Sequence, residues 1–174
     1  MANTLALATA SSLPFDYVAR QKIGGSHASI SFVKQFPVIP FDRIPADLQW
    51  EIIRRVAELT YFNHDLDGWA QELFDELTPA QRQELPQLGD LQPFPFNPER
   101  RAVLQAELDA IIGHLYGLNT GDMRYILDPE DVCGPGCINE TFRVLKDNEI
   151  RQYGEYRTKR LVMDAWYRFG YNIP

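Results

Sequence analysis

Residues 97–117 read NPERRAVLQAELDAIIGHLYG, and this stretch indicates the fold class. Asn97 can cap a helix, Pro98 suits its first turn, and Glu99 places an acid near the positive helix end. Gly117 is a typical stop signal. Between these ends, large aliphatic residues recur at helical spacing, namely Leu104, Leu108, Ile111, Ile112 and Leu115. The stretch therefore predicts a long helix with one buried face.

Further apolar patterns predict helices on both sides of this stretch. Leu48, Ile52 and Val56 recur at helical spacing after the start signal of Pro45. The predicted helices cover residues 5–23 with an interruption near Pro14, 47–63, 66–76, 120–127, 139–149 and 152–168. The many prolines of residues 78–98 predict an extended linker instead.

Residues 26–39 have a different pattern, which predicts a β-strand. Alternate side chains from Ile30 to Lys34 would face opposite sides, and Pro37 would confine the end of the strand to a sheet edge. A single strand needs a partner for its backbone groups. We therefore expect the N-terminal piece to be the end of a β-containing domain. The predicted fold is mainly α with a small β element, a helix–strand remnant followed by a helical tail.

Charge divides the chain into three segments. Residues 1–45, the end of the β-containing domain, carry a net charge of +2. Residues 46–98, the acidic helices and the linker, carry −7, and the helical region 99–174 carries −2. Because a phosphate-binding surface is basic, only the first segment and the last helix are plausible nucleic-acid contacts. The acidic middle is expected to face solvent or a basic partner.

Composition places the chain among ordinary globular proteins. Its 174 residues are 45% hydrophobic and 24% charged, which excludes a wholly disordered or collagen-like chain. No apolar run approaches the roughly 18 residues that cross a bilayer, so we expect no membrane association. No Lys or Arg precedes Arg20, so we expect no export signal and a cytoplasmic location.

Residues that commonly carry catalysis form no recognisable motif. The sequence allows three interpretations of Cys133 and Cys137: half of a zinc site, a disulfide, or thiols without a role. We favour the third, because no second pair of metal ligands follows. The three histidines, His27, His64 and His114, lie outside any nucleophile motif. No glycine-rich phosphate loop is present. We predict no catalytic residue, no metal site and no cofactor bound by this chain.

The densest polar stretch is DYVARQKIGGSH, residues 16–27, at the predicted helix-to-strand turn. Arginine and lysine can hold phosphate or a guanine edge, glycine allows close backbone approach, and serine and histidine supply short hydrogen bonds. The alternative is a solvated turn. The candidate DNA-binding residues are Arg20, Lys22, Gly24, Gly25, Ser26, His27 and Lys34.

A second basic stretch, YGEYRTKR at residues 153–160, combines cations with aromatic rings. Cations hold phosphate and aromatic rings stack on bases, which makes Arg157, Lys159 and Arg160 secondary phosphate-contact candidates. The alternative is a helix whose cations pair with the acidic middle of the chain.

These stretches also resemble a known family in its own order along the chain. The matching pieces are FDYVARQKIGGSH (15–27), FVKQFPVIP (32–40), LDA to HLYGL (108–118), YILD (125–128), ETFRVLK (140–146) and YGEYRTKRLV (153–162). They resemble the end of the target-recognition domain and the C-terminal helical tail of type IIG-like restriction–modification enzymes. Those enzymes fuse an adenine-specific DNA methyltransferase to a specificity region. The resemblance covers most of residues 13–167 and does not include Cys133 or Cys137.

The resemblance implies a role in reading double-stranded DNA for methylation. Family members bind S-adenosylmethionine through a glycine motif and hold a flipped adenine with an Asn-Pro-Pro-aromatic motif. This chain contains neither, nor the carboxylate and lysine cluster of a nuclease. We therefore expect a non-catalytic specificity fragment that works with a methyltransferase or nuclease polypeptide. The alternatives are a scaffold module that docks on a methyltransferase without touching DNA, and a non-functional gene remnant.

Overall fold

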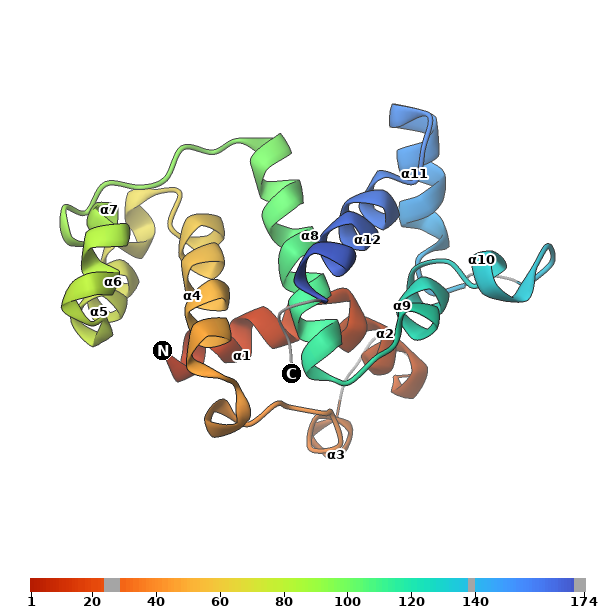
Figure 1. Ribbon diagram of the computed structural model, residues 1–174, viewed down its shortest axis with the longest axis horizontal. Helices are drawn as coiled ribbons and strands as arrows, with labels where there is room; N and C mark the ends of the chain where they lie inside the picture. The colour runs from red at the N-terminus through yellow and green to blue at the C-terminus, as the bar shows by residue number, and fades with distance from the viewer. Residues whose placement is uncertain (24–28, 138–139, 171–174) are drawn as a thin grey trace.

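The computed structural model describes residues 1–23, 29–137 and 140–170 (Figure 1). These residues form helices and no strand. The helices are α1 (Ala2–Ala10), α2 (Leu13–Lys22), α3 (Ile30–Val33), η1 (Phe41–Arg43), α4 (Ala46–Thr60), η2 (His64–Leu66), α5 (Asp67–Glu76), α6 (Pro79–Glu84), α7 (Pro86–Gly89), α8 (Pro98–Leu115), α9 (Thr120–Leu127), α10 (Glu130–Cys133), α11 (Arg143–Tyr153) and α12 (Arg157–Phe169).

The predicted β element is wrong: the described part of residues 26–39 contains the short helix α3 and no strand. The backbone N–H groups of Lys34 and Gln35 donate to the carbonyls of Ile30 and Phe32, at 3.1 and 2.9 Å. No neighbouring strand is present in the described residues, so these groups are satisfied within the segment. Ile30, Phe32 and Val33 are all exposed, so the alternation of side chains that predicted a strand produces no buried face.

Helices occur where they were predicted around the central stretch, although the last two are displaced: α11 and α12 begin at Arg143 and Arg157, not at 139 and 152. The predicted linker is only partly extended. Thr78 caps α6 and exchanges hydrogen bonds with Gln81, while Pro79 occupies the first turn. Pro86 starts α7 in the same way. Proline has no backbone donor to lose in a first turn, so these two prolines begin helices rather than prevent them. The chain is extended only over 92–97.

Helix α8 lies at the centre and belongs to two cores (Figure 1). One side carries Leu108, Ile111 and Ile112 into a core with α1, α4, α5 and α7. The opposite side carries Ala106 and Ala110 into a smaller core with α9 and α12. A helix that is apolar on both sides is buried on both sides. The sequence pattern predicted the first face only.

Helices α1 and α2 join these two halves: in Figure 1, α1 runs across the lower parts of α4 and α8, and α2 continues to α9. Ser12 separates them and caps α2, and Pro14 lies in the first turn of α2, at the predicted interruption. The backbone N–H of Leu13 donates to Asp109 Oδ1 at 2.7 Å. This bond attaches the start of α2 to the centre of α8.

Candidate nucleic-acid interface

Three of the predicted DNA-binding residues lie at the exposed ends of α2 and α3. Arg20 and Lys22 occupy the last turn of α2, where cations interact favourably with the helix dipole. The guanidinium of Arg20 bonds Asp16, with Nε 2.9 Å from Oδ2, and lies 5.7 Å from the ring centre of Phe142. Lys34 follows α3 and is exposed. No ion pair joins Lys22 or Lys34 to another residue of the described segments.

The other four predicted DNA-binding residues, Gly24, Gly25, Ser26 and His27, lie outside the described residues. They follow Ile23, whose backbone N–H closes α2 by donating to Ala19. The structure therefore places Arg20 and Lys22 on the same helical turn. It does not describe how Gly24 to His27 are arranged relative to them.

The secondary candidates on α12 are paired with carboxylates of the same chain. Arg157 Nη2 lies 2.6 Å from Glu99 Oε2, and Arg160 Nε lies 3.0 Å from Glu155 Oε1. These partners belong to segment 99–174 and not to the acidic middle that the alternative reading proposed. A phosphate group at this helix would compete with carboxylates that are already in place.

Lys159 belongs to a polar group that we call the Asp128 cluster: Arg124, Asp128, Glu130, Asp131, Lys146 and Lys159. The Asp128 side chain is only 9% exposed and lies 2.9 Å from Lys146 Nζ and 3.3 Å from Lys159 Nζ. These contacts connect the end of α9 to α11 and α12. Asp131 adds a 2.8 Å contact to Arg124 and a 3.0 Å contact to Lys159.

The electrostatics of the Asp128 cluster favour charged side chains. A hydrogen bond from Arg124, helped by Lys159, lowers the pKa of Asp131 below its usual range. Burial pulls the pKa of Lys146 down, but hydrogen bonds to Glu130 and Asp128 outweigh it and leave that pKa raised. The sequence analysis missed this cluster, although three of the family-like pieces each contribute one member.

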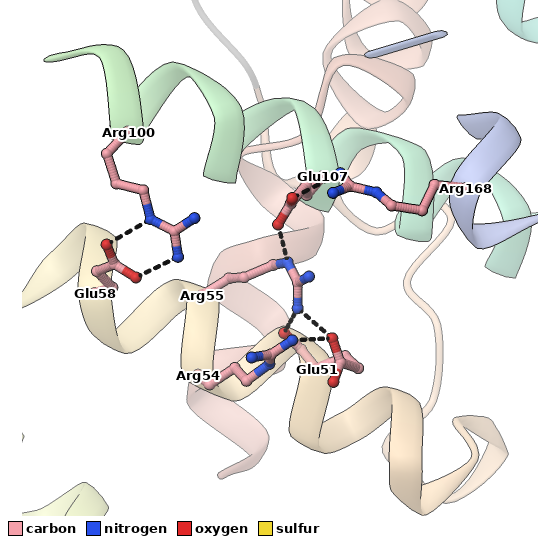
Figure 2. Close-up of polar contacts among 7 residues, drawn as sticks. All are labelled: Glu51, Arg54, Arg55, Glu58, Arg100, Glu107 and Arg168. Carbon is pink, nitrogen blue, oxygen red and sulfur yellow. Dashed lines mark hydrogen bonds and ion pairs between the residues drawn. The ribbon is translucent and has the colours of Figure 1, made fainter. Parts of the chain in front are cut away.

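A second group, the Glu107 cluster, lies between α4, α8 and α12 and consists of Glu51, Arg55, Glu107 and Arg168 (Figure 2). Arg55 Nε donates to Glu107 Oε2 at 2.7 Å, and Arg168 Nη2 donates to the other carboxylate oxygen at 2.7 Å. The side chains of Arg55 and Glu107 are 6% and 7% exposed. The buried Glu107 carboxylate of α8 therefore connects α4 and α12 through its two arginine partners.

Two arginines at the edge of this cluster also have carboxylate partners. Burial raises the pKa of Glu51, but hydrogen bonds from Arg54 and Arg55 outweigh it and leave that pKa lowered. Arg100 forms a two-bond contact with Glu58, at 2.8 and 2.9 Å (Figure 2). The sequence signal for the cluster was an acidic residue, Glu107, that directly precedes Leu108 of the apolar stripe of α8.

A cavity of about 390 Å³ opens beside the Glu107 cluster and is lined by residues of α4, α6, α7, α8 and α12. Arg54 Nε and Gln87 Oε1, from two of its lining residues, are buried without a hydrogen-bond partner. Both atoms are shielded from solvent, so neither is presented to a molecule in the cavity. Its lining carries four arginines, each paired with a carboxylate, and three glutamates, of which Glu84 accepts a hydrogen bond from Trp50 Nε1.

The two histidines in the described segments contact residues of their own surroundings. The His114 ring stacks on Trp166 with 3.6 Å between ring centres, and its Nε2 lies 3.1 Å from the Trp166 carbonyl oxygen. Burial lowers the pKa of His114. His64 is exposed beside Asp67. The third histidine, His27, lies outside the described residues.

Within residues 1–23, 29–137 and 140–170, no three His, Cys, Asp or Glu side chains group as ligands for a metal ion. In the same segments, no helix is long and apolar enough to cross a membrane. In comparisons with known proteins, no family model, no curated protein and no solved structure matches this chain.

Proposed function

We propose that this chain is a DNA-specificity component of an adenine-specific methyltransferase of the restriction–modification class. In this proposal α2, α3 and the residues between them face double-stranded DNA, and the helices from α8 to α12 form the supporting unit. The chain acts in the cytoplasm beside a methyltransferase polypeptide. That polypeptide binds S-adenosylmethionine and performs the chemistry.

The observation that carries the proposal is the Asp128 cluster. Three family-like pieces, YILD, ETFRVLK and YGEYRTKRLV, each contribute one of its residues: Asp128, Lys146 and Lys159. The three residues are 18 and 13 positions apart, yet meet at one buried carboxylate. In this chain the three pieces therefore pack together as one helical unit, as the tail implied by the resemblance would require.

The exposed cations of the first segment support the DNA-facing side of the proposal. Arg20, Lys22 and Lys34 are all exposed, and the segment that holds them is the one with net positive charge. Arg20 is held by Asp16 on the same helix, which orients its guanidinium but reduces the charge that it offers. Phosphate contacts from such residues contribute affinity that falls steeply with salt.

The experiment is the binding of a fluorescently labelled DNA duplex to the purified chain, followed by anisotropy over a series of salt concentrations. The test variant is Arg20→Glu with Lys22→Glu. We expect weaker binding and a salt slope shallower by about two, one for each lost phosphate contact. The control, called the α11 variant, is Arg151→Glu at the far end of α11 with Arg100→Glu in the first turn of α8, which changes the net charge equally at two exposed positions.

The proposal fails if the folded wild-type chain binds no duplex at low salt. It also fails if the two double variants weaken binding to the same extent, because the effect is then one of overall charge. Selective loss in the α2 variant, with the α11 variant close to wild type, supports a DNA contact at α2.

An apolar surface favours the second candidate function, a module that docks on a methyltransferase without touching DNA. Ile30, Val33 and Val38 are 73%, 48% and 64% exposed within a short segment that includes α3. Exposed apolar side chains that form a patch are typical of protein–protein contacts. The test is co-purification with a tagged adenine-specific methyltransferase encoded beside this chain. Retention of the wild type, loss for Ile30→Asp with Val33→Asp, and no DNA affinity would favour this candidate.

A further inference from the structure

Cys133 and Cys137 lie at the two ends of a tight exposed turn, CGPGC, that follows α10. Gly134 and Gly136 adopt φ values of 87° and 95°, a region that side chains with a Cβ rarely enter. The backbone N–H of Cys137 donates to the carbonyl of Gly134 at 3.3 Å. The two glycines and this bond turn the chain back so that the second cysteine approaches the first.

The two thiols contact each other across this turn. The influence of the neighbouring Cys133 thiol, together with burial, raises the pKa of the Cys137 thiol. Cys133 is exposed, whereas Cys137 is half-buried. The exposed thiol is therefore the one that a dissolved oxidant reaches first.

The start of the turn is already anchored to the Asp128 cluster. Glu130 contacts Lys146 at 2.8 Å, and Asp131 contacts Lys159 at 3.0 Å. The N–H of Gly134 also donates to the Glu130 carbonyl at 3.0 Å. These contacts hold α10, and with it the Cys133 end of the turn, against α11 and α12.

We propose that Cys133 and Cys137 are a redox modification site, which closes reversibly into an intramolecular disulfide by exchange with a small disulfide such as oxidised glutathione. The proposal stands on the geometry of the turn and is independent of the proposed DNA function. Transient disulfides of this kind occur in reducing compartments as redox-responsive features. Closure would tie the turn to the end of α10, beside the carboxylates that connect α9, α11 and α12.

The exchange proceeds in two balanced steps. The Cys133 sulfur attacks one sulfur of oxidised glutathione, forms a mixed disulfide and releases one glutathione thiolate. The Cys137 sulfur then attacks the Cys133 sulfur, which breaks the mixed disulfide and releases the second glutathione thiolate. The two protein thiols give up two protons and two electrons, and the two departing glutathione molecules take them up.

The experiment exposes the purified full chain to oxidised glutathione, blocks free thiols, and analyses the products by mass spectrometry. Both cysteines lie in one tryptic peptide, because no Lys or Arg occurs between Arg124 and Arg143. We expect this peptide to lose two hydrogens and to gain no blocking group. The internal disulfide should exceed the glutathione adduct by about tenfold or more, because the second thiol is held at high effective concentration.

Two single variants and a denatured control separate the folded turn from simple sequence proximity. Cys137→Ser should stop at a stable glutathione adduct on Cys133, whereas Cys133→Ser should react far less. In concentrated urea, the ratio of internal disulfide to adduct should fall, because the turn no longer holds the thiols together. Glutathione adducts on both cysteines, disulfide-linked dimers, or an unchanged ratio in urea would overturn the proposal.

Discussion

The Glu107 carboxylate accepts hydrogen bonds from Arg55 and Arg168, while only 7% of its side chain is exposed. Glu107→Ala would remove one of the two carboxylates that the buried Arg55 guanidinium contacts and leave Glu51 as the other. Removing one member of a buried ion pair costs about 3–5 kcal/mol. We expect a loss of this size in the free energy of unfolding, measured by urea denaturation.

Two comparisons make this prediction specific to burial. Glu58→Ala breaks an ion pair with Arg100, whose side chain is 51% exposed, and should cost no more than about 1 kcal/mol. Replacing the buried pair as Arg55→Met with Glu107→Leu should recover much of the loss, because no buried charge then remains unpaired. Equal losses for Glu107→Ala and Glu58→Ala would contradict the prediction.

Asp109 provides a prediction about pH. Burial raises the pKa of its carboxyl from 3.8 to about 7, although the hydrogen bond from the Leu13 N–H acts in the opposite direction. Between these values the unfolded chain releases the proton and the folded chain retains it. Ionisation of Asp109 therefore disfavours folding progressively as pH rises from about 4 to 7, with no further change above.

Asp109→Asn removes this titration and keeps an oxygen that can accept from Leu13. The free energy of unfolding of the variant, relative to wild type, should rise by up to a few kcal/mol between pH 4 and 7 and then level off. The measurement is urea denaturation at a series of pH values. Parallel pH profiles for the two proteins would show that Asp109 titrates normally.

At the scale of elements, the approach of α8 to α12 depends on Gly113. A Cβ at this position would lie 2.9 Å from Cζ3 of the Trp166 ring and 3.3 Å from Met123 Sδ. Trp166 is buried and stacked on His114, so it has little room to move. Gly113→Ala should lower the free energy of unfolding, because overpacking costs about 1–3 kcal/mol and outweighs the helix-propensity gain of about 1 kcal/mol.

Gly68 is the matched control for this prediction. It lies in α5, and a Cβ there would meet nothing within 4 Å. Gly68→Ala should therefore raise the midpoint of urea unfolding through helix propensity alone. If both alanine variants shift the midpoint in the same direction, the close contact between α8 and α12 does not restrict the size of the side chain at position 113.

At the scale of the whole molecule, α8 supplies side chains to both cores, so each half depends on the same helix. We expect one cooperative unfolding transition. The variant Trp50→Phe with Trp69→Phe leaves Trp166 as the sole tryptophan, which reports on the smaller core. Its fluorescence and the circular dichroism of all the helices should give the same urea midpoint.

A fluorescence transition that precedes the loss of helix would contradict this prediction, because the smaller core would then open first. The absence of any cooperative transition would favour the gene-remnant alternative over either proposed function. Coincident transitions would show that the chain folds as one unit, which both proposed functions require.

Local sequence signals accounted for the principal helices and failed where a partner was needed. Asn97 caps α8 through its side chain, bonding the N–H groups of Glu99 and Arg100 as its residue type indicates. The alternation from Ile30 to Lys34 predicted a strand, but a strand also needs a neighbour to pair with. Thr78 before Pro79 was a helix start signal that the sequence analysis read as part of a linker.

The candidate site was predictable to a smaller degree. Arg20 and Lys22 were expected together at a helix end and lie there. Lys159 was expected to be available for phosphate, but it contacts Asp128 and Asp131. The sequence does not show which lysine and aspartate will form an ion pair, since the strength of the pair depends on the distance and burial of the two charges in the folded chain.

The amino-acid order is sufficient to establish a mainly helical chain with an apolar central helix and two cations, Arg20 and Lys22, at the end of α2. Capping, proline position and apolar periodicity act within a few residues, so they can be read locally. Folding adds the second buried face of α8, the 52-residue link between Arg55 and Glu107, and the meeting of Asp128 with Lys146 and Lys159. These features depend on residues that are far apart in the sequence. A buried charge needs a partner of opposite charge, and only the packing of the helices brings that partner near.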